Sequence, residues 1–279
     1  MQISDHMKDA VEKGYALAAF NAPSFDAMSA IAKAAKVQDK PVIIQTSARL
    51  VKQHTADAVG QWFQTAKKIW GAQCYLHLDH CVDLALISDC IDAGWDMVMF
   101  DGSHFEIGKN IDLSQQVSAM AHRKGVAVEG EIGCIGGEED GLSADANYAN
   151  PDETARLVAE GGLDCIAVGF GNVHGDYETK ANLRWDIYEA AYDVTGLPLV
   201  LHGGSGLTDA EFARAIRAKS AKVNISTDLK KAYVQALESA EMKGKILSAP
   251  SAVHDAIFES CFDVAGTYIN KFNPTEGTL

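Results

Sequence analysis

Short apolar runs recur along the chain, separated by segments with a helical pattern. Eight of these runs predict strands, and most are continuous rather than alternating, which is typical of parallel strands buried on both faces. The predicted strands are Ala16–Phe20, Val42–Gln45, Cys74–Leu78, Met97–Phe100, Val126–Glu131, Cys165–Val168, Leu199–Leu201 and Lys222–Ile225.

The segments between these runs predict helices. Ala27, Ile31 and Ala34 recur at the spacing of one helical face. Asn150-Pro151 and Thr208 supply the capping signals with which helices begin. The predicted helices are Asp26–Gln38, Asp57–Trp70, Leu84–Ala93, a helix that starts at Pro151, Thr208–Ala218 and Thr227–Met242.

A strand–helix unit repeated about eight times predicts an α/β protein, either a closed parallel barrel or a doubly wound sheet. Polar residues follow the strands so consistently that the barrel is favoured, and 279 residues suit a single (β/α)8 TIM barrel of roughly 250 residues. We predict one domain over 1–279. It includes a mobile loop at about 136–149, which is polar, long and glycine-bearing, and a C-terminal helical extension at about 245–279.

The charge of the chain narrows the partners. With 38 acidic and 24 basic residues the formal net charge is −14, which disfavours nucleic acid and anionic membranes. An anionic substrate would need a local positive centre, such as a metal, a helix N-terminus or an isolated arginine or lysine. No apolar run of about 18 residues predicts a membrane span, and the first residues lack an apolar signal core, so a cytoplasmic protein is expected.

Three histidines follow three separate predicted strands. Catalytic residues of barrels lie just past the C-terminal ends of the strands, so His80, His174 and His202 are expected to converge. Three imidazoles with one open position form a common catalytic zinc arrangement, and a zinc site is therefore predicted. Asp79, next to His80, is predicted to act as a general acid/base, or alternatively to orient a histidine.

Two further strand ends carry carboxylates, Asp101 and Glu131. They could orient ligands, provide an alternative metal position or be polar structure at the barrel mouth. The loops after the seventh and eighth strands usually form the phosphate site of such barrels, and glycines let backbone N–H groups approach an anion. The predicted phosphate-binding residues are Gly203, Gly204, Ser205, Asn224, Ser226 and Thr227.

At these residues the sequence resembles the class II, metal-dependent ketose-bisphosphate aldolases, which include the fructose- and tagatose-bisphosphate enzymes. The stretches that carry the resemblance lie between about residues 14 and 236: LHLDHC, FDGSH, EGEIGCIGGEEDG, GFGNVHG, LVLHGGSG and KVNISTDLK. The resemblance implies reversible retro-aldol cleavage of a ketose 1-phosphate or 1,6-bisphosphate to dihydroxyacetone phosphate and an aldehyde.

The resemblance also implies individual roles. It implies that His80, His174 and His202 bind zinc, and that Asp79 acts on the C4 oxygen. Glu139 is the candidate for proton transfer at C3. It further implies a second or resting metal position at Asp101 and Glu131, and a homodimer or homotetramer.

The resemblance places the substrate as well. It implies that dihydroxyacetone phosphate is held at Gly175, Gly203, Ser205, Asn224 and Thr227. A monovalent cation, Na⁺ or K⁺, would border Gly175 and Gly203. Asn21 and Ser47 match substrate-contacting positions.

Two departures from the family pattern point to the far end of the substrate. Residues 245–253, KILSAPSAV, lack the arginine with which family members commonly reach the far phosphate, and Arg49 stands where bisphosphate enzymes often differ. A related sugar with another acidic far-end group is therefore predicted. Arg49 could pair with its carboxylate, sulfonate or phosphate, or could be a surface residue.

Three other functions remain open from the sequence. One is a metal-dependent hydrolase on a TIM barrel, although the first strand lacks the H-x-H pair that such enzymes often have. Another is a non-catalytic barrel that binds a sugar phosphate. A weaker alternative is a lysine Schiff-base aldolase, for which Lys222 is the one candidate on a strand.

Overall fold

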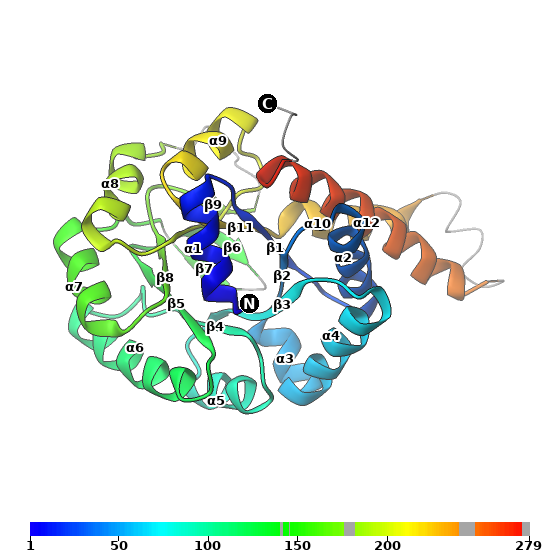
Figure 1. The fold of residues 1–279 in the computed structure, drawn as a ribbon, viewed down its shortest axis with the longest axis horizontal. Helices are drawn as coiled ribbons and strands as arrows, with labels where there is room; N and C mark the ends of the chain where they lie inside the picture. Colours follow the sequence, from blue (N-terminus) through cyan, green and yellow to red (C-terminus); the bar gives the residue numbers. More distant parts are fainter. Residues whose placement is uncertain (140–141, 145, 176–181, 240–248, 275–279) are drawn as a thin grey trace.

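In the computed structural model the described residues are 1–139, 142–144, 146–175, 182–239 and 249–274, with the backbone alone described at 138, 139 and 142–144. Eight parallel strands close a barrel in the order β1-β11-β10-β8-β5-β4-β3-β2 (Figure 1). This confirms the (β/α)8 barrel. The strands are β1 Leu17–Asn21, β2 Val42–Ser47, β3 Cys74–Cys81, β4 Met97–Phe100, β5 Ala127–Ile132, β8 Cys165–Val168, β10 Leu199–Leu201 and β11 Ser220–Ile225.

Helices surround the barrel, and every predicted helix is present within a few residues (Figure 1). The predicted end of the last of these, at Met242, lies outside the described residues. Four helices were not predicted, namely α1, α3, α6 and α8, and of these α6 and α8 begin without a side-chain cap. The helices are α1 Ile3–Lys13, α2 Phe25–Gln38, α3 Ala48–His54, α4 Ala56–Trp70, α5 Leu84–Asp92, α6 Ile107–His122, α7 Pro151–Gly161, α8 Trp185–Thr195, α9 Asp209–Arg217, α10 Thr227–Glu238 and α12 Ser251–Phe272.

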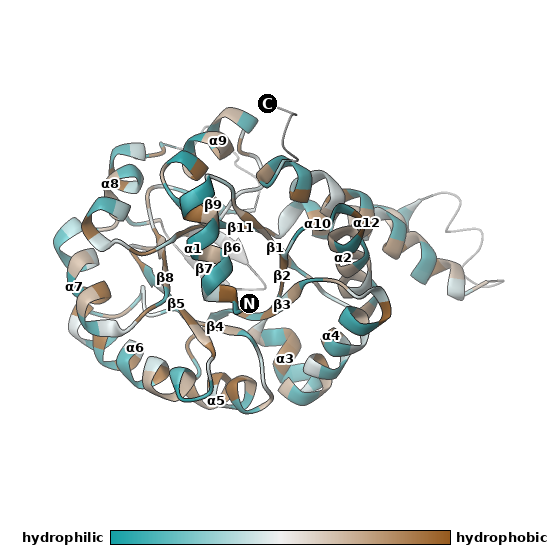
Figure 2. Ribbon diagram, in the orientation of Figure 1, coloured by the Kyte–Doolittle hydropathy of each residue, from teal (hydrophilic) through white to brown (hydrophobic). Residues whose placement is uncertain are grey.

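Alternate residues of each strand belong to two separate apolar clusters. Leu17, Ile43 and Met97 pack with the buried face of α1 inside the barrel, whereas their chain neighbours Ala18 and Val98 pack against the outer helices. Because both faces of the strands are buried, the strands are mainly apolar, and the hydrophilic residues gather on the outward faces of the helices (Figure 2). The helix α1 thus covers one end of the barrel, which leaves the other end for polar side chains.

The segment predicted as a loop at 136–149 contains a hairpin instead. Its strands β6 Gly136–Glu139 and β7 Leu142–Ala144 are antiparallel, and β6 also pairs in parallel with β9 Val173–His174. The two short strands were not predicted, because GGEE has no apolar alternation, and the mobility of this segment stays a prediction. The hairpin attaches this segment to the strand that carries His174.

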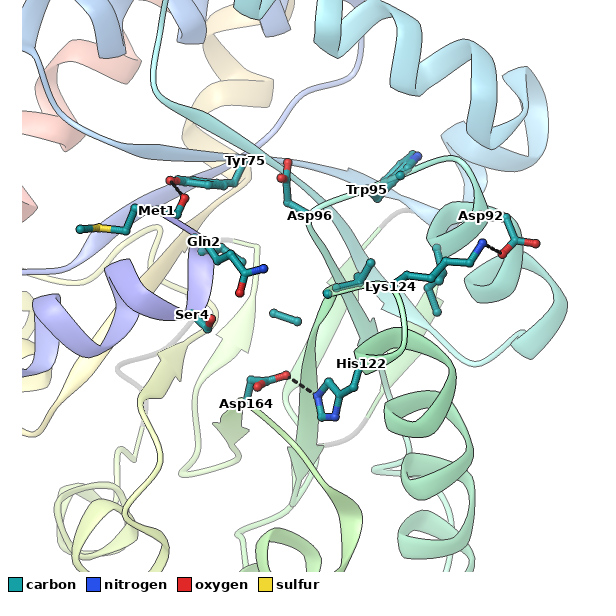
Figure 3. Close-up of a pocket in the computed structure, with 16 residues that line it drawn as sticks. Met1, Gln2, Ser4, Tyr75, Asp92, Trp95, Asp96, His122, Lys124 and Asp164 are labelled. Carbon is teal, nitrogen blue, oxygen red and sulfur yellow. Dashed lines mark hydrogen bonds and ion pairs between the residues drawn. The ribbon is translucent and has the colours of Figure 1, made fainter.

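A cavity of about 550 Å³ lies at the end of the barrel that α1 covers (Figure 3). Its walls come from the first residues of the chain and from the N-terminal ends of β3, β4 and β5. Two side-chain pairs lie on its walls: His122 Nε2 is 2.9 Å from Asp164 Oδ2, and Lys124 Nζ is 2.8 Å from Asp92 Oδ1. In TIM barrels the residues at this end contribute to stability rather than catalysis, so the functional site is expected at the C-terminal ends of the strands.

None of the described helices is long and apolar enough to cross a membrane. The helix α12 packs instead on α2 and α10, beside the barrel (Figure 1). Its last residue, Phe272, is fully buried, and the backbone N–H of Ala16 donates to the Phe272 carbonyl at 3.0 Å. The C-terminal helix is therefore anchored at the start of β1.

We expect Phe272→Ala to lower the free energy of unfolding by about 3–5 kcal/mol, because it removes a fully buried aromatic ring and leaves a cavity. Denaturant titration measures the change. Val194→Ala, at a side chain that is 43% exposed, is the control and should change stability by less than about 0.5 kcal/mol. Equal effects of the two variants would contradict the anchoring role of Phe272.

Candidate active site

Three histidines converge at the C-terminal ends of the strands. His80 comes from β3, His174 from β9, and His202 follows β10 directly. One ring nitrogen of each lies within 4.8 Å of the others, and the ring centroids of His80 and His202 are 4.7 Å apart. The structure therefore brings together the three residues that the sequence predicted as metal ligands.

The hydrogen bonds of these rings leave two nitrogens facing each other. His80 Nδ1 lies 3.0 Å from Asp101 Oδ2, and His202 Nε2 lies 2.7 Å from Glu129 Oε1. A carboxylate accepts, so these two nitrogens carry the protons in the neutral rings. The other pair, His80 Nε2 and His202 Nδ1, then presents two lone pairs only 2.9 Å apart. Such a donor set fits a divalent cation of the kind that imidazoles bind.

The local charge also favours a cation. Burial lowers the pKa of His80, but Asp79, Asp101 and Glu131 outweigh it and leave the pKa well above its usual value. Burial lowers the pKa of His202, against the opposing hydrogen bond to Glu129. His202 is therefore neutral, while a proton and a metal ion compete for His80.

An irregularity in β3 directs two consecutive side chains to the site. Neighbouring residues of a strand normally point to opposite faces, yet Asp79 and His80 both belong to the site. The register of β3 against β4 shifts between Leu78 and Cys81, and His80 has a φ of 39° in the left-handed region. A non-glycine residue rarely adopts this φ, and such local strain is typical of functional sites.

Asp79 is buried beside the histidines and is held by amides. Asn21 Nδ2 donates to its Oδ2 at 2.7 Å and Gln45 Nε2 to the same oxygen at 3.1 Å. Asn224 Nδ2 lies 3.4 Å from Oδ1. Because all three partners are neutral donors, the carboxylate is oriented without being neutralised. This suits a group that has to exchange a proton.

Asp101 and Glu131 lie on the Nδ1 side of the His80 ring. Their carboxylate oxygens are 3.0 and 3.7 Å from that nitrogen, and together with His80 they form a second possible metal group. Glu131 Oε2 is buried without a hydrogen-bond partner. Burial, and then Asp101, raise the pKa of Glu131 well above its usual value. The geometry suits the second metal position that the sequence predicted.

Two glycines allow β9 to approach the barrel. A Cβ at Gly137 would lie 2.3 Å from the His174 carbonyl oxygen, and one at Gly203 would lie 2.2 Å from the Val173 carbonyl oxygen. Both glycines have positive φ. Larger residues would therefore displace the strand that carries His174. Gly175, at the end of the same segment, also has positive φ but no such close neighbour.

The loops after β10 and β11 lie together, as predicted for a phosphate site. A Cβ at Gly204 would be 3.0 Å from the Asn224 carbonyl oxygen, and Ser205 Oγ accepts from the Asp228 N–H at 3.4 Å. Asn224 Oδ1 and Ser226 Oγ are buried without hydrogen-bond partners. Thr227 starts α10, so the positive end of this helix adjoins the loops and favours an anion.

A separate cavity of about 210 Å³ opens beside Asn21. Ser47, Arg49 and Lys230 line it, and Arg49 is exposed. Asn21 also donates to Asp79, so this cavity shares one residue with the surroundings of the acid/base candidate. Arg49 lines this cavity, and its role at the far end of the substrate stays a prediction.

Some predictions fall elsewhere. The side chain of Glu139 lies outside the described residues. Lys222 is fully buried inside the barrel, with Nζ 2.8 Å from Glu129 Oε2, so a substrate carbonyl has no access to it. No role was predicted from the sequence for Gln45 or Glu129. A polar residue within an otherwise apolar strand was the signal that could have found both.

The family model of fructose-bisphosphate aldolase class II matches residues 1–276. A 6-phospho-5-dehydro-2-deoxy-D-gluconate aldolase of Shouchella clausii is 40% identical over 231 residues, or 80% of this chain and 77% of the relative. A fructose-bisphosphate aldolase of Streptococcus pyogenes serotype M1 is 40% identical over 231 residues, or 81% and 78%. The YdjI aldolase of Escherichia coli K12 superposes with a TM-score of 0.85 at 27% identity, covering 98% of this chain and 97% of that one.

A TIM barrel with convergent histidines and carboxylates at its strand ends defines a candidate metal-dependent barrel enzyme. The comparisons make this specific: the chain belongs to the class II fructose-bisphosphate aldolase family. It is an aldolase, and therefore a carbon–carbon lyase.

We expect zinc affinity to keep rising with pH above 6.5, by about tenfold per pH unit, until the raised pKa of His80 is passed. The reason is that the metal needs the lone pair which a proton occupies below that pKa. Chelator competition at pH 6, 7 and 8 measures the affinity. Asp101→Asn removes one carboxylate that raises this pKa, so its affinity should level off at lower pH. A wild-type affinity that is already constant above pH 7 would contradict the expectation.

Proposed function

We propose that the chain cleaves an acidic ketose phosphate reversibly to dihydroxyacetone phosphate and an aldehyde, at a zinc ion held by His80, His174 and His202. The observation that carries the proposal is the meeting of three imidazole nitrogens from separate segments, with Asp79 oriented beside them. Bound there, zinc would polarise the substrate ketone and stabilise the negative charge that develops on its oxygen.

Asp79 is proposed to take the proton from the hydroxyl group that becomes the aldehyde. As this O–H proton leaves, the C=O bond forms, and the electron pair of the broken carbon–carbon bond stays on the carbon next to the ketone. That carbon then has to be protonated, for which Glu139 is proposed. Asn21 and Gln45 hold Asp79 at Oδ2, and Oδ1, which accepts only the longer 3.4 Å bond from Asn224, is proposed to receive the proton of the reacting hydroxyl group.

The two ends of the substrate are proposed to lie in different places. The phosphate of the dihydroxyacetone half would bind the loops that contain Gly203, Ser205 and Asn224, beside the start of α10. The bordering monovalent cation, Na⁺ or K⁺, would lie near Gly175 and Gly203. Asp101 and Glu131 are proposed to hold a second metal position.

The far end of the substrate would occupy the cavity lined by Ser47, Arg49 and Lys230. Several relatives are named for cleaving 6-phospho-5-dehydro-2-deoxy-D-gluconate, which carries a carboxylate at the end opposite its phosphate. Cleavage between its C3 and C4 would leave dihydroxyacetone phosphate and a three-carbon aldehyde acid. Arg49 could form a paired hydrogen bond with that carboxylate. Assembly as a homodimer or homotetramer remains a prediction.

We expect zinc-loaded protein to release dihydroxyacetone phosphate from such a substrate, and full chelation to abolish this release. Asp79→Asn should lower kcat by about 10²–10⁴-fold with zinc content unchanged, because it removes the proton acceptor. A coupled dehydrogenase assay follows the product. The matched control is Asp92→Asn, at the other end of the barrel, which should keep wild-type activity. Release that survives complete metal removal would end the proposal.

We expect Arg49→Ala to raise KM about 10–100-fold for 6-phospho-5-dehydro-2-deoxy-D-gluconate, the effect of losing a charged hydrogen bond. Fructose 1-phosphate, with its neutral far end, should be affected little. The control is Lys52→Ala, which removes a nearby cation that pairs with Asp83 at 3.1 Å outside the cavity. An equal loss for both substrates would place Arg49 outside the far-end site.

A further inference from the structure

A buried ion pair spans the interior of the barrel below the histidines. Lys222 on β11 and Glu129 on β5 are both fully buried, and Lys222 is the only buried lysine or arginine among the described residues. Their strands are separated in the barrel by β10 and β8, so the two side chains meet across the interior. Lys222 Nζ lies 2.8 Å from Glu129 Oε2.

Stability alone gives no reason for this pair. Removing two charges from water costs as much as their attraction returns, and apolar side chains of similar volume often stabilise a protein as well or better. The neighbouring interior positions Met97, Met99 and Val200 are apolar, so the barrel is able to fill its centre in that way. The pair therefore calls for an explanation at the site above it.

The two oxygens of Glu129 have separate partners. Oε2 accepts from Lys222, and Oε1 accepts from His202 Nε2 at 2.7 Å. The Cys165 thiol lies 4.0 Å from Oε2, too far for a strong bond. The ammonium group thus both balances the carboxylate charge and sets its rotation, which directs Oε1 at His202.

His77 is not an alternative donor to this carboxylate. Its Nε2 lies 3.7 Å from Glu129 Oε2, and its Nδ1 lies 3.3 Å from Gln45 Oε1. The amide nitrogen of Gln45 donates to Asn21 and Asp79, so its oxygen is left to accept a hydrogen bond from the N–H at His77 Nδ1. His77 Nε2 then carries a lone pair and has no proton to offer Glu129.

We propose that Lys222 is a positioning residue for the metal site, which acts through Glu129 to hold His202 with its proton on Nε2 and its Nδ1 lone pair toward His80. The inference rests on the proposed function only in that His202 binds the metal. Metal-ligating histidines depend on such a partner at the other ring nitrogen, and its loss weakens metal binding.

Zinc affinity, measured by chelator competition, tests the proposal independently of aldolase activity. Lys222→Met should weaken zinc binding by about 10–100-fold and shift the visible absorption of the Co²⁺-loaded protein, because His202 loses its fixed orientation. The matched control is Lys219→Met. Lys219 Nζ donates to the Val11 carbonyl oxygen over 3.2 Å and takes no part in the site. It should leave both readouts unchanged. Thermal unfolding of the metal-free proteins separates a loss of stability from a loss of binding.

Lys222→Met leaves the buried Glu129 carboxylate without its counter-ion and could fail to fold. The double variant Glu129→Gln/Lys222→Met has side chains of similar volume and neither charge, so it is expected to fold in that case. It should also bind zinc about tenfold more weakly, because a neutral amide is a poorer acceptor for the imidazole. Zinc affinity and a Co²⁺ spectrum like those of wild type, in either folded variant, would overturn the proposal.

Nitrogen-15 spectra of metal-free wild-type protein decide the matter if neither variant folds. A proton on Nε2 of His202 supports the proposal, and a proton on Nδ1 overturns it. A wild-type protein that binds zinc in this way but releases no dihydroxyacetone phosphate would refute the proposed function and leave this inference intact.

Discussion

The mouth of this barrel depends on the balance of buried charge. Asp79, Asp101, Glu129 and Glu131 are all buried near the histidines, and Lys222 is the one buried lysine or arginine among the described residues. Buried carboxylates are costly unless a cation or hydrogen-bond donors compensate them. Glu129 has Lys222 as its counter-ion, whereas Asp79, Asp101 and Glu131 all act on His80 and raise its pKa. A cation held by the imidazoles would relieve the remaining negative charge, so the arrangement of the buried acids favours metal binding at this place.

Apolar, orienting and reacting side chains follow one another along the strands of the barrel. The end of the barrel near α1 is filled by apolar side chains such as Leu17 and Met97, which supply the core. Polar interior residues lie further along the strands: Gln45 stands two residues beyond Ile43, and Glu129, bound to Lys222, stands two beyond Ala127. The reacting groups follow at the strand ends. The middle layer thus holds the groups that orient, and the upper layer holds the groups that react. A change in the middle layer would be felt at the metal without any contact with substrate.

The sequence predicted most of the fold and the centre of the site, for clear reasons. Continuous apolar runs are a clear sequence signal for buried parallel strands. His80, His174 and His202 stand at or after strand ends, where closure of a barrel brings side chains together. Other features depend on information that no local pattern holds. The partnership of Lys222 with Glu129 exists only after strands three places apart close around a common interior. The hairpin of β6 and β7 forms by backbone pairing with β9, and GGEE carries no strand signal.

The two proposed anion sites differ in kind, and this difference would separate chemistry from specificity. The phosphate loops rely on backbone, small side chains and a helix terminus, which closure of the barrel between β10 and β11 positions. The cavity beside Asn21 relies on long side chains, Arg49 and Lys230, carried by helices outside the barrel. Residues on such helices can change without moving a strand, whereas a change at Gly203 would disturb β9 and His174. Specificity for the aldehyde half can therefore diverge while the half that becomes dihydroxyacetone phosphate stays the same.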